Sequence, residues 1–154
     1  MKLEELEQAP VIPLKDLLIL KLMTLRELDT IDTIALLLEN PEQINIASYR
    51  RKVVTAELTQ HINARIEAIS QLLRSGQADE VWKKYMGTGL SPKEIETALA
   101  ALKKLVIPTE FICPTSNSPQ KHTFKTDAPR IDNLGNLYAF CPIHTYTCYE
   151  LAVP

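Results

Sequence analysis

The chain has 154 residues, of which 45% are hydrophobic and 23% charged, and its formal charge is −2 at pH 7. These proportions argue against a disordered chain and against a protein that binds polyanions through a large excess of positive charge. The sequence lacks an uninterrupted apolar run of roughly 18 residues, so it predicts no membrane partner. Its acidic amino-terminal stretch is unlike a signal peptide, and we expect a cytoplasmic protein in a reducing compartment.

Composition changes near Pro108 and divides the chain into two parts. Residues 108–154 contain six of the ten prolines, six of the nine aromatic residues, all three cysteines and two of the three histidines. Residues 1–107 instead carry apolar side chains at the three- and four-residue spacing of amphipathic helices. We therefore predict a mainly α protein. A body of four or five helices spans 1–107, and a small β-rich appendage, a minor α+β component, spans 108–154.

The first part of the body has leucines at helical spacing from Leu14 to Leu28, followed by an apolar segment over 31–38 that ends before Pro41. The pattern does not decide between one bent helix and two. The longest predicted helix runs from about Ser48 to Ser75, since apolar residues recur there every three or four positions. Such a long amphipathic surface predicts a partner helix or self-association into a homo-oligomer.

Sharper local signals follow along the chain. Ser91-Pro92-Lys93-Glu94 is a capping box with proline in the first turn, and it predicts a helix that continues to Leu105. Beyond Pro108, alternating patterns predict short strands over 111–113, 122–125, 137–141 and 145–151. About 45 residues of sheet bury too little surface to be stable alone. We expect the helical body, a metal ion or a crosslink to hold the appendage.

The strongest chemical signal is a group of sulfur and imidazole side chains within 36 residues: Cys113, His122, Cys141, His144 and Cys148. Zinc uses thiolate and imidazole ligands in structural sites, and four of them complete its tetrahedron. Cys141-Pro-Ile-His144 has the two-residue gap that lets a tight turn aim two side chains at one ion. Cys113-Pro-Thr-Ser116 is its counterpart.

The stretch from residue 110 to 150 resembles a zinc ribbon, a family in which two short Cys-Pro-x-Cys-like turns at the ends of β-hairpins share one zinc ion. The resemblance rests on the two Cys-Pro turns, their separation and the strands that follow. Ser116 stands where the family has a ligand, and a histidine replaces the usual cysteine in the second turn. The resemblance implies a binding module more than a catalyst. It implies one structural zinc with the ligands Cys113, Cys141 and His144, and either His122 or Cys148 as the fourth.

Other interpretations of the cluster stay open. In one alternative, the cysteines pack as small hydrophobic residues in a metal-free sheet. In another, two of them form a disulfide or redox pair, which a reducing compartment disfavours. A catalytic thiol needs a positioned base. His144 and Cys148, four residues apart on an extended strand, would lie about 13 Å from each other, beyond hydrogen-bond reach.

The leading functional hypothesis is a non-enzymatic adaptor or regulatory protein that binds a macromolecular partner through the long helix and the C-terminal module. The sequence shows no recognisable acid–base pair, nucleotide loop or cofactor fingerprint. One alternative is a nucleic-acid-binding regulator that uses the basic start of the long helix, Arg50, Arg51 and Lys52. Another alternative is a small enzyme that depends on a thiol or a metal.

Overall fold

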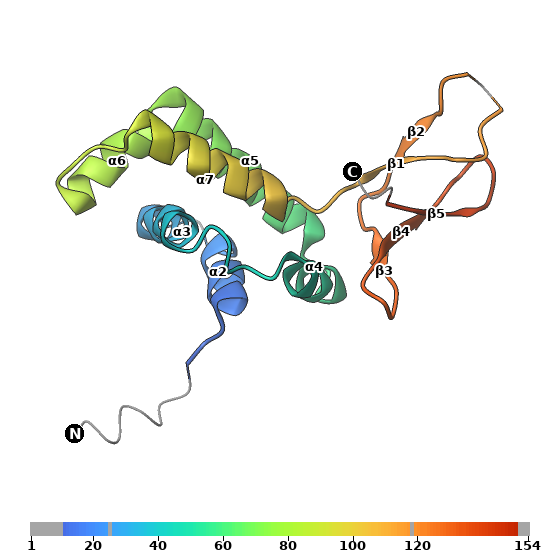
Figure 1. Cartoon of the computed structure of the whole chain (residues 1–154), viewed down its shortest axis with the longest axis horizontal. Helices are drawn as coiled ribbons and strands as arrows, with labels where there is room; N and C mark the ends of the chain where they lie inside the picture. The colour runs from blue at the N-terminus through green and yellow to red at the C-terminus, as the bar shows by residue number, and fades with distance from the viewer. Residues whose placement is uncertain (1–10, 25, 118, 151–154) are drawn as a thin grey trace.

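The computed structural model describes residues 11–24, 26–117 and 119–150, which form six helices and five strands (Figure 1). The helices are α2 (Leu14–Leu22), α3 (Glu27–Glu39), α4 (Ile46–Thr55), α5 (Thr59–Ser75), α6 (Gln77–Met86) and α7 (Pro92–Leu105). The strands are β1 (Glu110–Ile112), β2 (Thr123–Lys125), β3 (Arg130–Ile131), β4 (Leu137–Phe140) and β5 (Thr147–Tyr149). The predicted class, a mainly α body with a small β appendage, is confirmed. The described body has six helices in place of four or five.

The helical body packs around one core of mainly aliphatic side chains, to which Tyr49 and Trp82 also belong. α3 packs against α2 and α7, and α5 packs against α6 and α7. The apolar stripe of α5 consists of Ile62, Ile66, Ile69 and Leu73, and all four are buried within the chain. Self-association was predicted from an exposed apolar stripe on the long helix, but this part of the stripe packs inside the chain. Among the described residues, no helix has the length and apolar character needed to cross a membrane.

The long helix predicted over 48–75 is wrong, because the chain breaks it into α4 and α5. Glu57 lies between them with a φ of 58°, in the left-handed region. The backbone N–H of Leu58 donates to the Val53 carbonyl oxygen at 3.0 Å, and that of Glu57 donates to the Val54 carbonyl oxygen at 3.1 Å. These two bonds form a Schellman motif, which usually has glycine at the left-handed position. Since glutamate occupies it here, the sequence carries no signal for the break.

Most other predicted helix ends agree with the structure. α2 and α3 are two separate helices, and α3 ends at Glu39, before the Asn40-Pro41 pair. Gly76, with a φ of 81°, closes α5, and the capping box of Ser91 and Glu94 is present at the start of α7. The start of α4 differs, because Asn45 is the N-cap and its side chain accepts a hydrogen bond from the backbone of Ser48.

The appendage consists of two small antiparallel sheets, β1–β2 and β3–β4–β5. In β1 and β2 the central residues Phe111 and Phe124 face each other, with ring centroids 5.9 Å apart. In β4, Leu137 and Ala139 are buried while their neighbours are more exposed, so one face of each sheet points inward. Strands 122–125 and 137–141 are confirmed to within two residues. The predicted strand over 145–151 reaches Leu151, which lies outside the described residues.

The appendage lies beside α4 (Figure 1). Side chains of α4 and α5 contact the appendage and the linker that precedes it. The Asn63 side chain donates to the Ile107 carbonyl oxygen at 2.8 Å and accepts from the Ile107 N–H at 2.9 Å, which fixes the linker to α5. Arg50 of α4 forms an ion pair with Glu150 at 3.0 Å. Because the Arg50–Glu150 pair crosses the boundary near Pro108, the division into two domains stays a prediction.

Candidate metal centre

Four side chains of the appendage bring their donor atoms together: Cys113, His122, Cys141 and His144. One sulfur or nitrogen atom from each lies within 4.8 Å of the atoms of the other three. Both cysteines are buried and both histidines are half-buried. The cluster could hold a metal ion, and its arrangement loosely fits a zinc-ribbon-like segment.

The β1–β2 hairpin supplies the first pair of side chains. Its ladder pairs Ile112 with Thr123, and the next step pairs Cys113 with His122, whose carbonyl oxygen accepts from the Cys113 N–H at 3.1 Å. Strand alternation places Cys113 on the same inward face as Phe111, two residues earlier. The hairpin therefore aims one thiol and one imidazole at the same point.

A tight turn between β4 and β5 supplies the second pair. Cys141 follows Ala139 on the inward face of β4, and its N–H donates to the Tyr146 carbonyl oxygen at 2.8 Å. The Cys141 carbonyl oxygen accepts from the Thr145 N–H at 2.9 Å, and Thr145 has a φ of 56°. This closed turn returns the side chain of His144 toward the Cys141 sulfur, as the two-residue gap predicts.

Distances within the cluster suit a tetrahedral ion. Around zinc, a sulfur and a nitrogen ligand lie about 3.5 Å from each other. In the structure, Cys113 Sγ lies 3.2 Å and Cys141 Sγ 3.5 Å from His144 Nδ1. His122 Nε2 lies 3.2 Å from Cys141 Sγ. The same distances also suit hydrogen bonds between thiol and imidazole groups.

Thr115 gives the Cys113 sulfur further support. Burial raises the pKa of the Cys113 thiol, but hydrogen bonds from the Thr115 side chain and backbone, and from Cys141 and His144, outweigh burial and lower this pKa to about 6. Thr115 Oγ1 lies 3.0 Å from the sulfur. A hydroxyl that donates to a thiolate in this way stabilises and orients a metal ligand.

Cys148, the fifth predicted ligand, is not a member of the group of four. It pairs with Ala139 across β4 and β5, and it is buried. Burial, together with the neighbouring sulfurs of Cys113 and Cys141, raises the pKa of the Cys148 thiol to about 11. Its sulfur lies 4.0 Å from the Tyr146 carbonyl oxygen. Among the described residues, the cluster thus contains His122 where the sequence left the choice between His122 and Cys148 open.

The predicted nucleic-acid contacts lie on α4 and already have partners within the chain. Arg50 pairs with Glu150, and Lys52 pairs with Asp16 at 2.8 Å. Arg51 donates from Nη2 to the Asn133 carbonyl oxygen at 3.4 Å. Arg50 therefore holds the appendage, whereas the side chains of Arg51 and Lys52 stay exposed.

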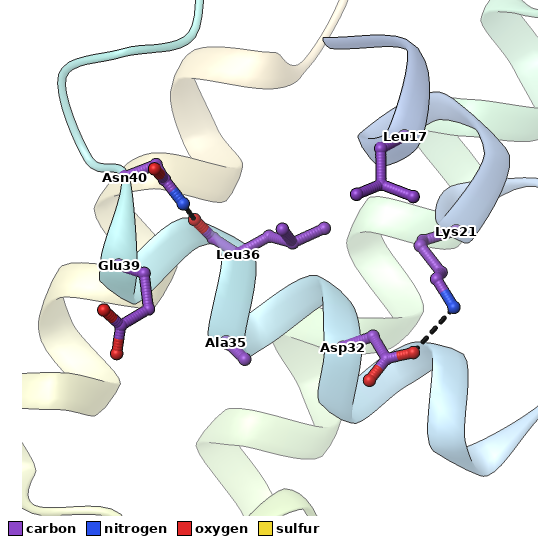
Figure 2. Close-up of a pocket in the computed structure, with 7 residues that line it drawn as sticks. All are labelled: Leu17, Lys21, Asp32, Ala35, Leu36, Glu39 and Asn40. Atoms are coloured by element: carbon purple, nitrogen blue, oxygen red, sulfur yellow. Dashed lines mark hydrogen bonds and ion pairs between the residues drawn. The ribbon is translucent and has the colours of Figure 1, made fainter. Parts of the chain in front are cut away.

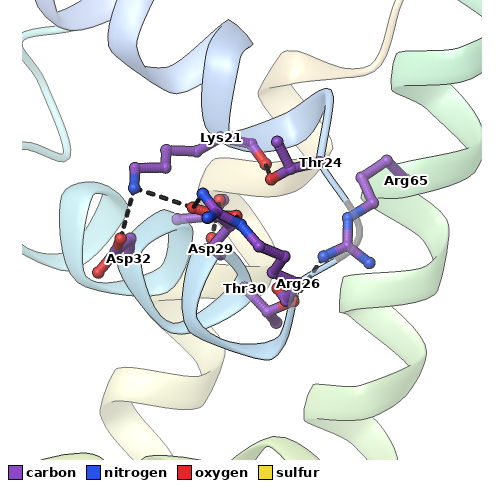
Figure 3. Close-up of polar contacts among 8 residues, drawn as sticks. Lys21, Thr24, Arg26, Asp29, Thr30, Asp32 and Arg65 are labelled. Carbon is purple, nitrogen blue, oxygen red and sulfur yellow. Dashed lines mark hydrogen bonds and ion pairs between the residues drawn. The ribbon is translucent and has the colours of Figure 1, made fainter.

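A second polar cluster surrounds Asp29 in the body (Figure 3). Arg26 donates two hydrogen bonds to its carboxylate, and Lys21 Nζ lies 2.9 Å from Asp29 and 2.6 Å from Asp32. Hydrogen bonds from Arg26, then Lys21 and Thr24, hold the pKa of Asp29 well below its ordinary value. Because the charges are paired and connect α2 to α3, we interpret this cluster as structural.

A hollow of about 370 Å³ opens between α2 and α3 (Figure 2). Its described lining combines leucine and alanine side chains with the ion pair of Lys21 and Asp32. The side-chain amide of Asn40 donates to the Leu36 carbonyl oxygen at 3.1 Å along its wall. None of these lining residues is a cysteine or a histidine, so the hollow does not belong to the candidate metal centre.

Sequence reasoning missed Thr115 as a partner of the Cys113 sulfur. Its position inside the Cys-Pro-Thr-Ser turn, two residues after the cysteine, is the signal that could have pointed to it.

Comparisons with known proteins give this chain no family. No protein-family model matches it, and no curated protein matches it. No solved structure matches it either.

Proposed function

We propose that the chain is a non-enzymatic binding protein whose appendage is held in shape by one structural zinc ion. The proposed ligands are Cys113, His122, Cys141 and His144. The observation that carries this proposal is the convergence of four donor atoms, two sulfurs and two nitrogens, from two hairpins. Zinc accepts such a mixed set in tetrahedral geometry, whereas magnesium and calcium prefer oxygen ligands.

A structural role fits this cluster better than a catalytic one. Four protein ligands fill the tetrahedron and leave no open position for water or substrate. The appendage also needs a stabilising element, because few of its apolar side chains outside the proposed ligands belong to the buried core: Phe111, Phe124, Leu137, Ala139 and Cys148. Binding a metal ion supplies folding free energy to a small domain of this kind. A reducing compartment such as the cytoplasm keeps both thiols available for the ion.

The appendage, in place of the long helix, is then the part that contacts a macromolecular partner. Large apolar side chains are exposed on it, among them Phe140, Ile143, Tyr146 and Tyr149. Contiguous exposed apolar surface marks interaction sites in folded proteins. Support for an adaptor or regulatory role comes from this surface.

The test is the zinc content of untagged full-length protein purified without added metal, measured by elemental analysis. We expect about one zinc per chain, and we expect a chelator to unfold the appendage. His122→Gln and Cys141→Ser should lose the metal. The matched controls His61→Gln, in the exposed histidine of α5, and Cys148→Ala should keep it. Cobalt in place of zinc should give the visible absorption of a tetrahedral site with sulfur ligands.

Two outcomes contradict the proposal in different ways. Metal-free protein with three reactive thiols and an unchanged fold in chelator would rule out the zinc site. If Cys148→Ala loses zinc and His122→Gln keeps it, the wild-type protein has a zinc site but the proposed fourth ligand is wrong.

A further inference from the structure

One face of α4 is positively charged and takes no part in the metal centre. Arg51 and Lys52 each lie three or four residues from Ser48 and from Thr55, so the four residues line one side of the helix. Together with Lys15 of α2 they surround a hollow of about 480 Å³, and its described lining includes no carboxylate. Three cations and two hydroxyl groups around one hollow suit a phosphate group.

Within the described part of the chain, Asp16 is the carboxylate that contacts this basic face. It lies 3.5 Å from Lys15 and 2.8 Å from Lys52. Three cations against one carboxylate leave the face positive. A phosphate bound there would replace Asp16 as the partner of Lys52. It would also replace the long contact of the exposed Arg51 side chain with the Asn133 carbonyl oxygen.

The outward face of the three-stranded sheet carries aromatic rings. Tyr138 and Phe140 alternate along β4, and Tyr149 pairs with Tyr138 across β5. The ring centroid of Tyr138 lies 5.7 Å from that of Tyr149 and 6.4 Å from that of Phe140. The Arg130 guanidinium lies 5.9 Å from the Phe140 ring centroid. Phe140 and Tyr149 are exposed and Tyr138 is half-buried. Accessible rings beside an arginine form a platform on which planar groups stack.

A second hollow connects the basic face to the aromatic face. It measures about 510 Å³ and lies between the end of α4 and the β3–β4 hairpin. Thr55 lines both hollows, and Arg130 and Tyr138 line the second. Glu57 also lines the second hollow and would repel phosphate there. The surface therefore separates into a side for anions on α4 and a side for planar groups on the sheet.

We propose that this surface binds single-stranded nucleic acid, with phosphates on Lys15, Arg51 and Lys52 and bases stacked on the rings of Tyr138, Phe140 and Tyr149. A single strand exposes its bases to such rings, whereas a duplex hides them in its stack. An acidic peptide would use the cations but would leave the rings unused. The inference rests on the proposed function in one respect, because the metal-held appendage positions the aromatic face.

The test measures binding of labelled single strands of about 12 nucleotides, oligouridine and oligothymidine, to metal-loaded full-length protein by fluorescence anisotropy. We expect binding to single strands and at least about tenfold weaker binding to a duplex of equal length. With three cations on phosphates, the logarithm of the binding constant should fall with the logarithm of salt concentration at a slope of about −2.

Paired variants separate the two sides of the surface. Arg51→Glu should weaken binding about tenfold or more and lower the salt dependence, whereas Lys93→Glu, the same charge change at the exposed start of α7, should bind normally. Phe140→Ala and Tyr149→Ala should each weaken binding about fivefold or more. Tyr85→Ala removes an exposed ring from α6 and should leave binding unchanged.

Lack of binding to single strands in about 50 mM salt would overturn the proposal. So would normal binding by Arg51→Glu, or by both aromatic variants. Equal competition by polyglutamate, with no effect of the ring variants, would assign the cations to an acidic peptide instead. Zinc content is measured on every sample. Metal-free protein that binds normally contradicts only the zinc site, and zinc-loaded protein that does not bind contradicts only this inference.

Discussion

Asp29 is the buried carboxylate of the helical body, and its charge is matched by Arg26 and Lys21. Asp29→Asn keeps the size of the side chain but removes the charge that accepts these hydrogen bonds. Hydrogen bonds to a charged group contribute more than neutral ones. We expect the variant to lower the free energy of unfolding by about 1–2 kcal/mol, measured by urea unfolding and far-ultraviolet circular dichroism.

The effect of Asp29 should depend on pH. Because its folded-state pKa is depressed, its stabilisation is present above the unfolded-state pKa of about 4 and is lost as the pH falls toward the folded-state pKa. The difference between wild type and Asp29→Asn should therefore shrink between about pH 6 and about pH 3. Asp32→Asn is the control, since Asp32 is more exposed and contacts Lys21. An equal loss in both variants would contradict the special role of Asp29.

At the same scale, residue type and spacing predicted part of the candidate metal centre. Cys141 and His144 lie in one short turn, so local spacing alone predicted that they point together. The choice between His122 and Cys148 could not be made in this way. It depends on which residue lies opposite Cys113 at the end of the β1–β2 ladder, and that long-range register cannot be read from local spacing.

Glu57 determines where the helical elements of the body are divided. Its backbone lies in the left-handed region. This conformation is strained for a residue that has a Cβ atom and unstrained for glycine. Glu57→Gly should raise the free energy of unfolding by about 0.5–1 kcal/mol, since the relieved strain exceeds the added flexibility of the unfolded chain. Ala68→Gly, in the exposed interior of α5, should lower it by about 1 kcal/mol. Urea unfolding of both variants measures the contrast, and destabilisation by Glu57→Gly would contradict the Schellman ending.

Elements with a chemical marker at their ends could be predicted, and elements without one could not. Ser91, Glu94 and Gly76 mark helix ends through side-chain capping or through a backbone that favours glycine. The end of α4 uses a left-handed glutamate, and periodicity continues across it from Val54 to Leu58. An unbroken apolar period therefore predicted one long helix where tertiary packing folds the chain into two.

The whole molecule depends on how the appendage is attached to the body, and the Arg50–Glu150 pair is an ion pair at this junction. It joins residues 100 positions apart in the chain. Its side chains are about three-quarters buried, with exposed fractions of 24% and 29%. Partial burial weakens screening by water and salt, so this pair should contribute more than a pair on the open surface.

A charge swap tests whether this ion pair holds the two parts together. Arg50→Glu places two carboxylates side by side, and Glu150→Arg places two guanidinium groups there, so each single variant should speed amide hydrogen exchange in β3 and β4 relative to α5. The double variant restores opposite charges and should recover protection, with a coupling free energy of about 1 kcal/mol. Lys125→Glu reverses one charge of the exposed pair with Glu110 inside the appendage and should change little. A double variant no better protected than the sum of the two single variants would show that packing of α4 against β3, and not the ion pair, attaches the appendage.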